Sequence, residues 1–214
     1  MNLVVKAIKN VSSGWFGMLV NLAVGFFLSP FILHRLGDYA FGLWILAFSL
    51  SGYYGLFDLG IRSSIIRYVA KFAASGDYEE LRRIVNTSLF SYSCVALVLL
   101  VATGVGCLFV GPLFKVSPAY LPTARLLFLM VGSSLALGFP LSVFGGILQG
   151  LQEFYWLNLT QVASTLLRAL LIVLSLNHGR GLLTVALITV GLPLLSSCAY
   201  IPLVLRRVPV HFAR

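Results

Sequence analysis

Four ionisable residues lie within or beside long apolar stretches of this sequence. Asp58 and Arg62 are four positions apart, and Arg125 and Arg168 each occur in a later apolar stretch. A charged group at membrane depth is costly, and it usually faces a cavity or pairs with a partner. We therefore take these four residues as candidate substrate-binding residues lining a cavity.

The spacing of Asp58 and Arg62 places both side chains on one face if the helix is continuous. Two interpretations of this pair remain open. The two charges form an ion pair that stabilises one helix end, or they face a water-filled cavity.

Arg168 lies near the middle of its apolar stretch, too deep for its side chain to reach either interface without strain. It either donates hydrogen bonds to a carbonyl of a neighbouring helix or faces a wet internal cavity. Arg125 lies near the outer end of its stretch, where a guanidinium can reach the lipid headgroups.

The sign of these charges bears on the substrate. A cation-coupled antiporter needs carboxylates within the membrane to bind Na⁺ or H⁺, and the apolar stretches offer Asp58 alone. Guanidinium groups pair with phosphate in a bidentate geometry. The balance of charges therefore favours transport of an anion over export of a cation.

The sequence offers no constellation that indicates an enzyme. Cys94, Cys107 and Cys198 lie in apolar stretches without a CxxC pair, and the three histidines stand singly. Phosphate-binding glycine loops and zinc-binding HExxH helices do not occur. We therefore expect no catalytic residues, no metal and no cofactor, and because the basic residues do not cluster on a polar face, no nucleic-acid partner.

The composition shows what must position these residues. Of the 214 residues, 59% are hydrophobic and 10% are charged, whereas a soluble domain is about a quarter charged. About 20 apolar residues span the hydrocarbon core as a helix. Six stretches meet this length, at about 13–33, 40–70, 84–110, 121–149, 157–176 and 182–205. These predict an all-α polytopic membrane protein with six transmembrane helices in a single bundle over residues 1–214.

Glycine and proline predict where some of these helices end. We expect the first helix to end at Pro30 and the loop that follows, and the third to break at Gly111-Pro112. In the first connecting loop, Gly76 should stop a helix. Asp77, with Glu80 three residues later, predicts an N-cap, so a helix should begin near Tyr78 and run into the third span.

The distribution of basic residues predicts the orientation. The formal net charge is +9. With a cytoplasmic N-terminus, ten lysines and arginines fall on the inner side and four on the outer side, in agreement with the positive-inside rule. Six spans return the chain to its starting side, so we expect a multi-pass protein of the bacterial inner membrane with both termini in the cytoplasm.

Several short motifs resemble those of one transporter family. They are Phe41-Gly42-Leu43-Trp44, the run from Gly52 to Gly60 that includes Tyr53-Tyr54-Gly55-Leu56-Phe57-Asp58, Arg67-Tyr68-Val69-Ala70, Gly76-Asp77 with Glu80-Leu81, and Leu148-Gln149-Gly150-Leu151-Gln152 with Asn158-Leu159. In this order and spacing, the chain resembles the polysaccharide-biosynthesis proteins of the multidrug/oligosaccharidyl-lipid/polysaccharide flippase superfamily, the Wzx-type flippases. The resemblance covers nearly the whole chain.

This resemblance implies a transporter that moves undecaprenyl-pyrophosphate-linked oligosaccharide between leaflets for O-antigen, capsule or exopolysaccharide synthesis. Its partners would be membrane lipid and the lipid-linked oligosaccharide. Members of the family open alternately to each side around a cavity whose basic residues meet the pyrophosphate. Carried over by position and charge, Arg62 and Arg168 are the candidates for that contact.

The length departs from the family pattern of twelve to fourteen helices in two halves, because this chain corresponds to the N-terminal half only. We expect a truncated chain, or one that pairs with another copy or a separate second half. Two other functions remain open. One is a multidrug and toxin extrusion type antiporter, and the other is a non-transporting remnant or partner subunit.

Overall fold

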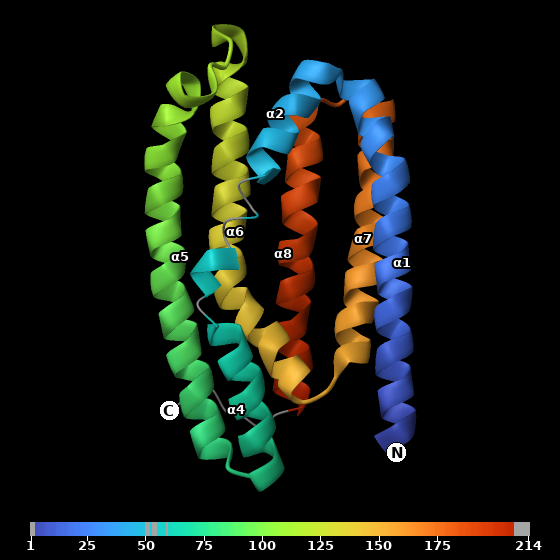
Figure 1. Cartoon of the computed structure of the whole chain (residues 1–214), viewed down its shortest axis with the longest axis vertical. Helices are drawn as coiled ribbons and strands as arrows, with labels where there is room; N and C mark the ends of the chain where they lie inside the picture. The colour runs from blue at the N-terminus through green and yellow to red at the C-terminus, as the bar shows by residue number, and fades with distance from the viewer. Residues whose placement is uncertain (1–2, 50–51, 53–54, 59, 208–214) are drawn as a thin grey trace.

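The computed structural model describes residues 3–49, 52, 55–58 and 60–207. The described residues form helices, turns and short connections without a strand, which confirms the predicted all-α class. Figure 1 shows the long helices lying roughly side by side along the longest axis of the molecule. The beginning of the first helix and the end of the last lie at the same end of the bundle.

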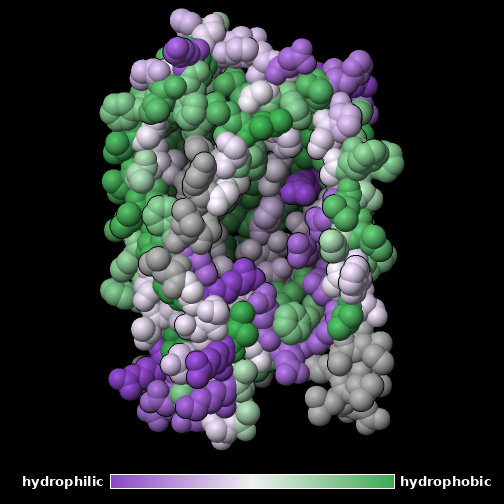
Figure 2. Space-filling view, viewed as in Figure 1, coloured by the Kyte–Doolittle hydropathy of each residue, from purple (hydrophilic) through white to green (hydrophobic). Residues whose placement is uncertain are grey.

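Five of the described helices are long and apolar enough to cross a membrane. They are α1 (Leu3–Leu36), α5 (Tyr78–Phe114), α6 (Leu121–Gly150), α7 (Phe154–Asn177) and α8 (Leu182–Arg207). Large apolar side chains remain exposed along all five, and Figure 2 shows them on both flanks of the molecule. This pattern is that of a polytopic membrane protein, whose outer surface meets lipid.

The prediction of a continuous second span over 40–70 is wrong. The chain forms α2 (Asp38–Ser49), the short 3-10 helix η1 (Gly55–Asp58) and α4 (Ile61–Ser75) instead. Gly60, just before α4, has φ +75°, a left-handed conformation that no helix interior accommodates. Figure 1 shows α2 near one end of the bundle, α4 near the other and η1 between them. The predicted six spans are therefore five continuous helices and one discontinuous segment.

Two predicted helix ends are also wrong. Helix α1 continues through Pro30 to Leu36, and α5 continues through Gly111 and Pro112 to Phe114. A proline inside a membrane helix is tolerated where other groups satisfy the freed carbonyl. Pro112 lies in the last turn of α5, so the helix has only two residues left beyond it.

The turn between α4 and α5 confirms the predicted caps. Helix α4 ends at Ser75, and Gly76 follows with φ +72° and donates its N–H to the carbonyl of Phe72. Asp77 caps α5, because its carboxylate accepts the backbone N–H of Glu80 at 3.1 Å. Helix α5 begins at Tyr78, so a single helix runs from this turn to Phe114.

Helix α6 is the centre of the packing and contacts α4, α5 and α8. The first core cluster joins these four helices through residues such as Ile65, Tyr92, Val143 and Val204. Helix α1 lies at one side of the bundle, where it packs mainly on α7 (Figure 1). Hydrogen bonds between polar side chains link α1 to α7: Asn158 to Ser13, Thr165 to Asn21 and Arg35 to Asn177.

Candidate functional site

Asp58 and Arg62 line one cleft of about 520 Å³ between the η1–α4 segment, α6 and α8. The face seen in Figure 2 is hollowed, and hydrophilic side chains gather in the hollow between two apolar flanks. The residues from the other two helices that line the cleft are Ser134, Leu135, Gly138, Phe139, Ser142, Pro193, Leu194 and Ser197. A positive charge, a negative charge and three hydroxyls thus face one space inside a membrane-spanning bundle.

Proline and glycine give the cleft its space. Pro193 lies inside α8, and its carbonyl accepts hydrogen bonds from the hydroxyls of Ser196 and Ser197. In α6, a Cβ added at Gly138 would meet no atom within 4 Å. Pro140 follows two residues later, and Figure 1 shows α6 bending along its length. Sharp helix bends usually occur at proline, so we attribute this bend to Pro140.

The Asp58 carboxylate accepts a hydrogen bond from the hydroxyl of Tyr92 on α5. Tyr92 is fully buried, and its ring packs edge-on against Phe139, with 5.5 Å between the ring centroids. The Tyr92 hydroxyl also lies within hydrogen-bonding reach of Ser142. The hydrogen bond between Tyr92 and Asp58 therefore links α5 to η1 at one wall of the cleft, and the packing of Tyr92 on Phe139 joins both to α6.

Arg62 is exposed in the first turn of α4. The predicted helical face shared with Asp58 does not exist, because Gly60 separates η1 from α4. Among the described residues, the partner of the Asp58 carboxylate is Tyr92, and no ion pair joins it to Arg62. The Arg62 guanidinium is left as a cation at the wall of the cleft.

Arg168 lies on α7, half-buried, and does not line the cleft of Asp58 and Arg62. It shares a helix side with the buried residues Thr165 and Ile172, three and four positions away. Leu166 and Leu170, which are 51% and 54% exposed, lie on the opposite side. Within the described ranges the guanidinium has no hydrogen-bond or ion-pair partner. The charge is thus turned away from the exposed leucines without being held by a neighbouring helix.

Arg125 lies far from the cleft, exposed in the second turn of α6. Nine positions separate it from Ser134, the first residue of α6 that lines the cleft, which is about 14 Å along a helix. Its backbone carbonyl accepts a hydrogen bond from the thiol of Cys107 on α5, at 3.1 Å. The four predicted residues therefore do not form one site: two share the cleft, and Arg168 and Arg125 lie elsewhere.

The sequence reasoning missed Tyr92 and the serines of the cleft. Ser134 and Ser142 are eight positions apart in α6, which is about two turns, and so lie near the same side. Small polar residues repeating along an apolar span often mark a helix–helix contact or a polar lining. The repeat of Ser134 and Ser142 along the apolar stretch could have predicted that these serines line a polar surface. For Tyr92, no local pattern indicates a contact with a residue 34 positions earlier.

Sequence comparisons relate the chain to proteins of polysaccharide biosynthesis. The model of a family described as polysaccharide biosynthesis protein matches residues 7–213. The "Putative O-antigen transporter" of Shigella flexneri is 26% identical over 161 residues, which are 74% of this chain and 37% of that protein. The "Uncharacterized membrane protein EpsK" of Bacillus subtilis (strain 168) is 24% identical over 165 residues, which are 77% of this chain and 33% of that protein.

The matched region thus spans about a third of the length of these curated relatives. No solved structure matches the chain.

Proposed function

The chain belongs to the polysaccharide biosynthesis protein family, and from this premise we propose that it carries lipid-linked oligosaccharide across the bacterial inner membrane. The family match and the apolar helices indicate a multi-pass membrane protein of polysaccharide biosynthesis. We propose further that the oligosaccharide is carried on undecaprenyl pyrophosphate. Both termini of the protein would lie in the cytoplasm. The similarity to the putative O-antigen transporter of Shigella flexneri supports the transport of a polysaccharide precursor.

The proposal rests on one observation, the exposed guanidinium of Arg62 at the wall of the cleft. Its guanidinium is exposed beside a cleft that also presents the hydroxyls of Ser134, Ser142 and Ser197. A guanidinium is a suitable donor for the oxygens of a pyrophosphate, and such charge-assisted hydrogen bonds are about twice as strong as neutral ones. The three hydroxyls donate to the carbonyls of Val190, Phe139 and Pro193 in this structure, so they would have to rotate to reach the substrate. The pyrophosphate would bind at Arg62, and the sugars would lie in the wider part of the cleft.

The hydrogen bond from Tyr92 gives Asp58 a role in this site. A free carboxylate in the cleft would repel a pyrophosphate and compete with it for Arg62. The Tyr92 hydroxyl satisfies the carboxylate from the wall of the cleft. Asp58 would thus be held away from Arg62, and the cation would remain available to the substrate.

Arg168 would contact the substrate at a second point along the transport path. It lies on a different helix from Arg62, half-buried and turned away from the exposed leucines of α7. A cation at that depth has a large desolvation cost, which an anionic ligand can offset. We propose that the pyrophosphate meets Arg168 in a different conformation of the bundle from the one in which it binds Arg62.

A second unit would complete the transport path. Transporters of this kind commonly bind substrate at the interface between two repeats, and the matched region covers about a third of each relative. We propose that another six-helix unit, a second copy or a distinct half, faces the hollowed side in Figure 2. Cysteine cross-linking between differently tagged copies in native membranes would distinguish the two, because only self-association gives a product joining both tags.

The test of the cleft is Arg62→Ala, followed by surface polysaccharide in a strain that depends on this protein. At equal protein level in the membrane, we expect at least a tenfold loss of export, with partial activity in Arg62→Lys. Lys71→Ala is the matched control, because it removes a positive charge from the same helix at an exposed position outside the cleft. Normal export by Arg62→Ala would remove the cleft from the proposed mechanism.

A further inference from the structure

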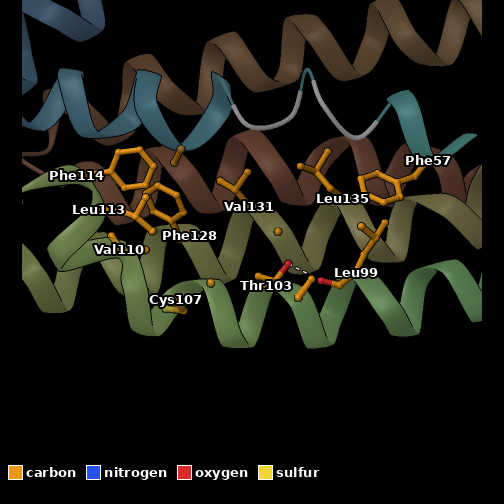
Figure 3. A pocket seen from close by; sticks show the side chains of 14 residues that line it. Phe57, Leu99, Thr103, Cys107, Val110, Leu113, Phe114, Phe128, Val131 and Leu135 are labelled. Atoms are coloured by element: carbon orange, nitrogen blue, oxygen red, sulfur yellow. Dashed lines mark hydrogen bonds between the residues drawn. The ribbon is translucent and has the colours of Figure 1, made fainter.

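A second, mainly apolar groove of about 280 Å³ lies between α2, η1, α5 and α6, and Leu135 separates it from the cleft of Arg62. Figure 3 shows Val110, Leu113, Phe114 and Phe128 gathered toward one end, with Leu99, Leu135 and Phe57 toward the other. The α5 residues that line it extend from Leu99 to Phe114, which is about 22 Å along a helix. The hydrocarbon of one leaflet is about 15 Å thick, so the groove is long enough to extend through one leaflet.

The groove offers almost no polar group to a ligand. Its two side chains that carry a donor hydrogen, Thr103 and Cys107, both donate to backbone carbonyls. Thr103 bonds Leu99 at 2.7 Å, as the dashed line in Figure 3 shows, and Cys107 bonds Arg125 at 3.1 Å. A ligand with polar groups at this depth would lose its hydration without gaining partners. The occupant must therefore be apolar along the groove.

Two glycines define the floor and the space of the groove. Gly132 of α6 lies so close to α5 that an added Cβ would come within 2.3 Å of the Thr103 side chain. Gly106 of α5 also lines the groove, but an added Cβ there would meet no atom within 4 Å. The two helices thus touch at Gly132, while Gly106 leaves room beside the contact.

Positive charge stands at the end of the groove beside the α5–α6 turn. Arg125 lies three positions before Phe128 and seven before Gly132, on the same side of α6 as these lining residues. Lys115 follows Phe114 directly at the end of α5. Both cations are exposed, and both lie near the turn between α5 and α6. The other end of the groove adjoins the cleft of Asp58 and Arg62, because Leu135 lines both and Phe57 directly precedes Asp58.

From this combination we propose that the groove binds one hydrocarbon chain of an anionic phospholipid, whose headgroup phosphate meets Arg125 and Lys115. The lipid comes from the leaflet beside the α5–α6 turn. Since a water molecule occupies about 30 Å³ of liquid, 280 Å³ holds about nine groups of water or methylene size. That volume suits part of one chain and is too small for a transmembrane helix about 10 Å across.

This binding site does not depend on the proposed transport function, and its test uses purified protein without transport. The full chain would be exchanged into micelles with equal amounts of phosphatidylglycerol and phosphatidylcholine, and bound lipid would be counted by native mass spectrometry. We expect one phosphatidylglycerol per chain, retained at least fivefold over phosphatidylcholine. Equal retention of the two lipids would overturn the headgroup contact and hence the proposal.

Matched variants locate the lipid. Gly106→Phe fills the groove and should reduce retention at least fivefold, whereas Gly104→Phe, an exposed position on the same helix outside the groove, should retain the lipid. Arg125→Gln with Lys115→Gln changes exposed residues only and should bring the preference between the two lipids close to one. Unchanged selective retention in the charge variant, or unchanged retention in a folded Gly106→Phe protein, would contradict the proposal.

Discussion

The buried hydroxyl of Tyr92 on α5 donates a hydrogen bond to the carboxylate of Asp58 in η1, across 34 residues of sequence. This bond ties the discontinuous second span to a continuous helix. The cleft of Arg62 begins at the same carboxylate. The contact therefore links the stability of the broken segment to the charge balance of the proposed substrate site.

Tyr92→Phe tests this link. Loss of the hydroxyl leaves the half-buried Asp58 carboxylate without its partner, which costs about 1–3 kcal/mol. We expect a lower melting temperature in detergent and weaker export, because the freed carboxylate can then pair with Arg62. In a double-mutant cycle, Asp58→Ala, which removes the acceptor oxygens, should abolish most of the effect of Tyr92→Phe. Additive effects of the two substitutions would contradict the coupling, and Tyr78→Phe, at an exposed position, is the control.

Arg168→Met should separate stability from function. The guanidinium is half-buried and has no partner among the described residues, so an apolar side chain of similar length removes a desolvation cost. We expect a melting temperature equal to or above that of the unchanged chain, together with at least a tenfold loss of polysaccharide export. Arg180→Gln, an exposed change beyond α7, is the control. A large loss of stability would instead assign Arg168 a structural role.

Gly132→Ala should destabilise the bundle at the α5–α6 contact. The added Cβ would lie 2.3 Å from the Thr103 side chain, so that side chain or one of the two helices must shift. Overpacking of this kind typically costs 1–3 kcal/mol. Thermal unfolding should show a lower melting temperature that Thr103→Ala restores in the double variant. Gly138→Ala on the same helix, where no atom lies within 4 Å, should change the melting temperature little.

Asp77→Ala should weaken the start of α5. The Asp77 carboxylate accepts the Glu80 N–H at 3.1 Å, and loss of such a cap typically costs about 1 kcal/mol. Hydrogen exchange of the amides in the first turn of α5 should become faster, while exchange in α7 stays the same. Asp77→Asn keeps an oxygen acceptor and should behave like the unchanged chain. Equal exchange in the alanine variant would show that the cap contributes nothing measurable.

Local physics in the sequence was enough to predict the fold class and several helix ends. Long apolar stretches with few charges predict membrane helices because an isolated chain in lipid must satisfy its own backbone groups. The cap at Asp77 and the stop at Gly76 were equally predictable, since each depends on residues within one turn. Hydropathy did not reveal the break in the second span, because a broken and a continuous helix can be equally apolar. The left-handed Gly60 decides the difference.

The candidate residues were chosen by the sequence, and their grouping was decided by the tertiary structure. Charge in an apolar stretch marks Asp58, Arg62, Arg125 and Arg168 without any knowledge of neighbours. Whether two such residues share a cavity depends on the rotation of each helix about its axis and on the packing between helices. The rotation and packing of the helices place Tyr92 beside Asp58 and turn Arg168 away from the exposed leucines of α7. They also bring Arg125 near the groove-lining Phe128. Contacts between distant segments arise from packing across the bundle, which no local stretch of sequence encodes.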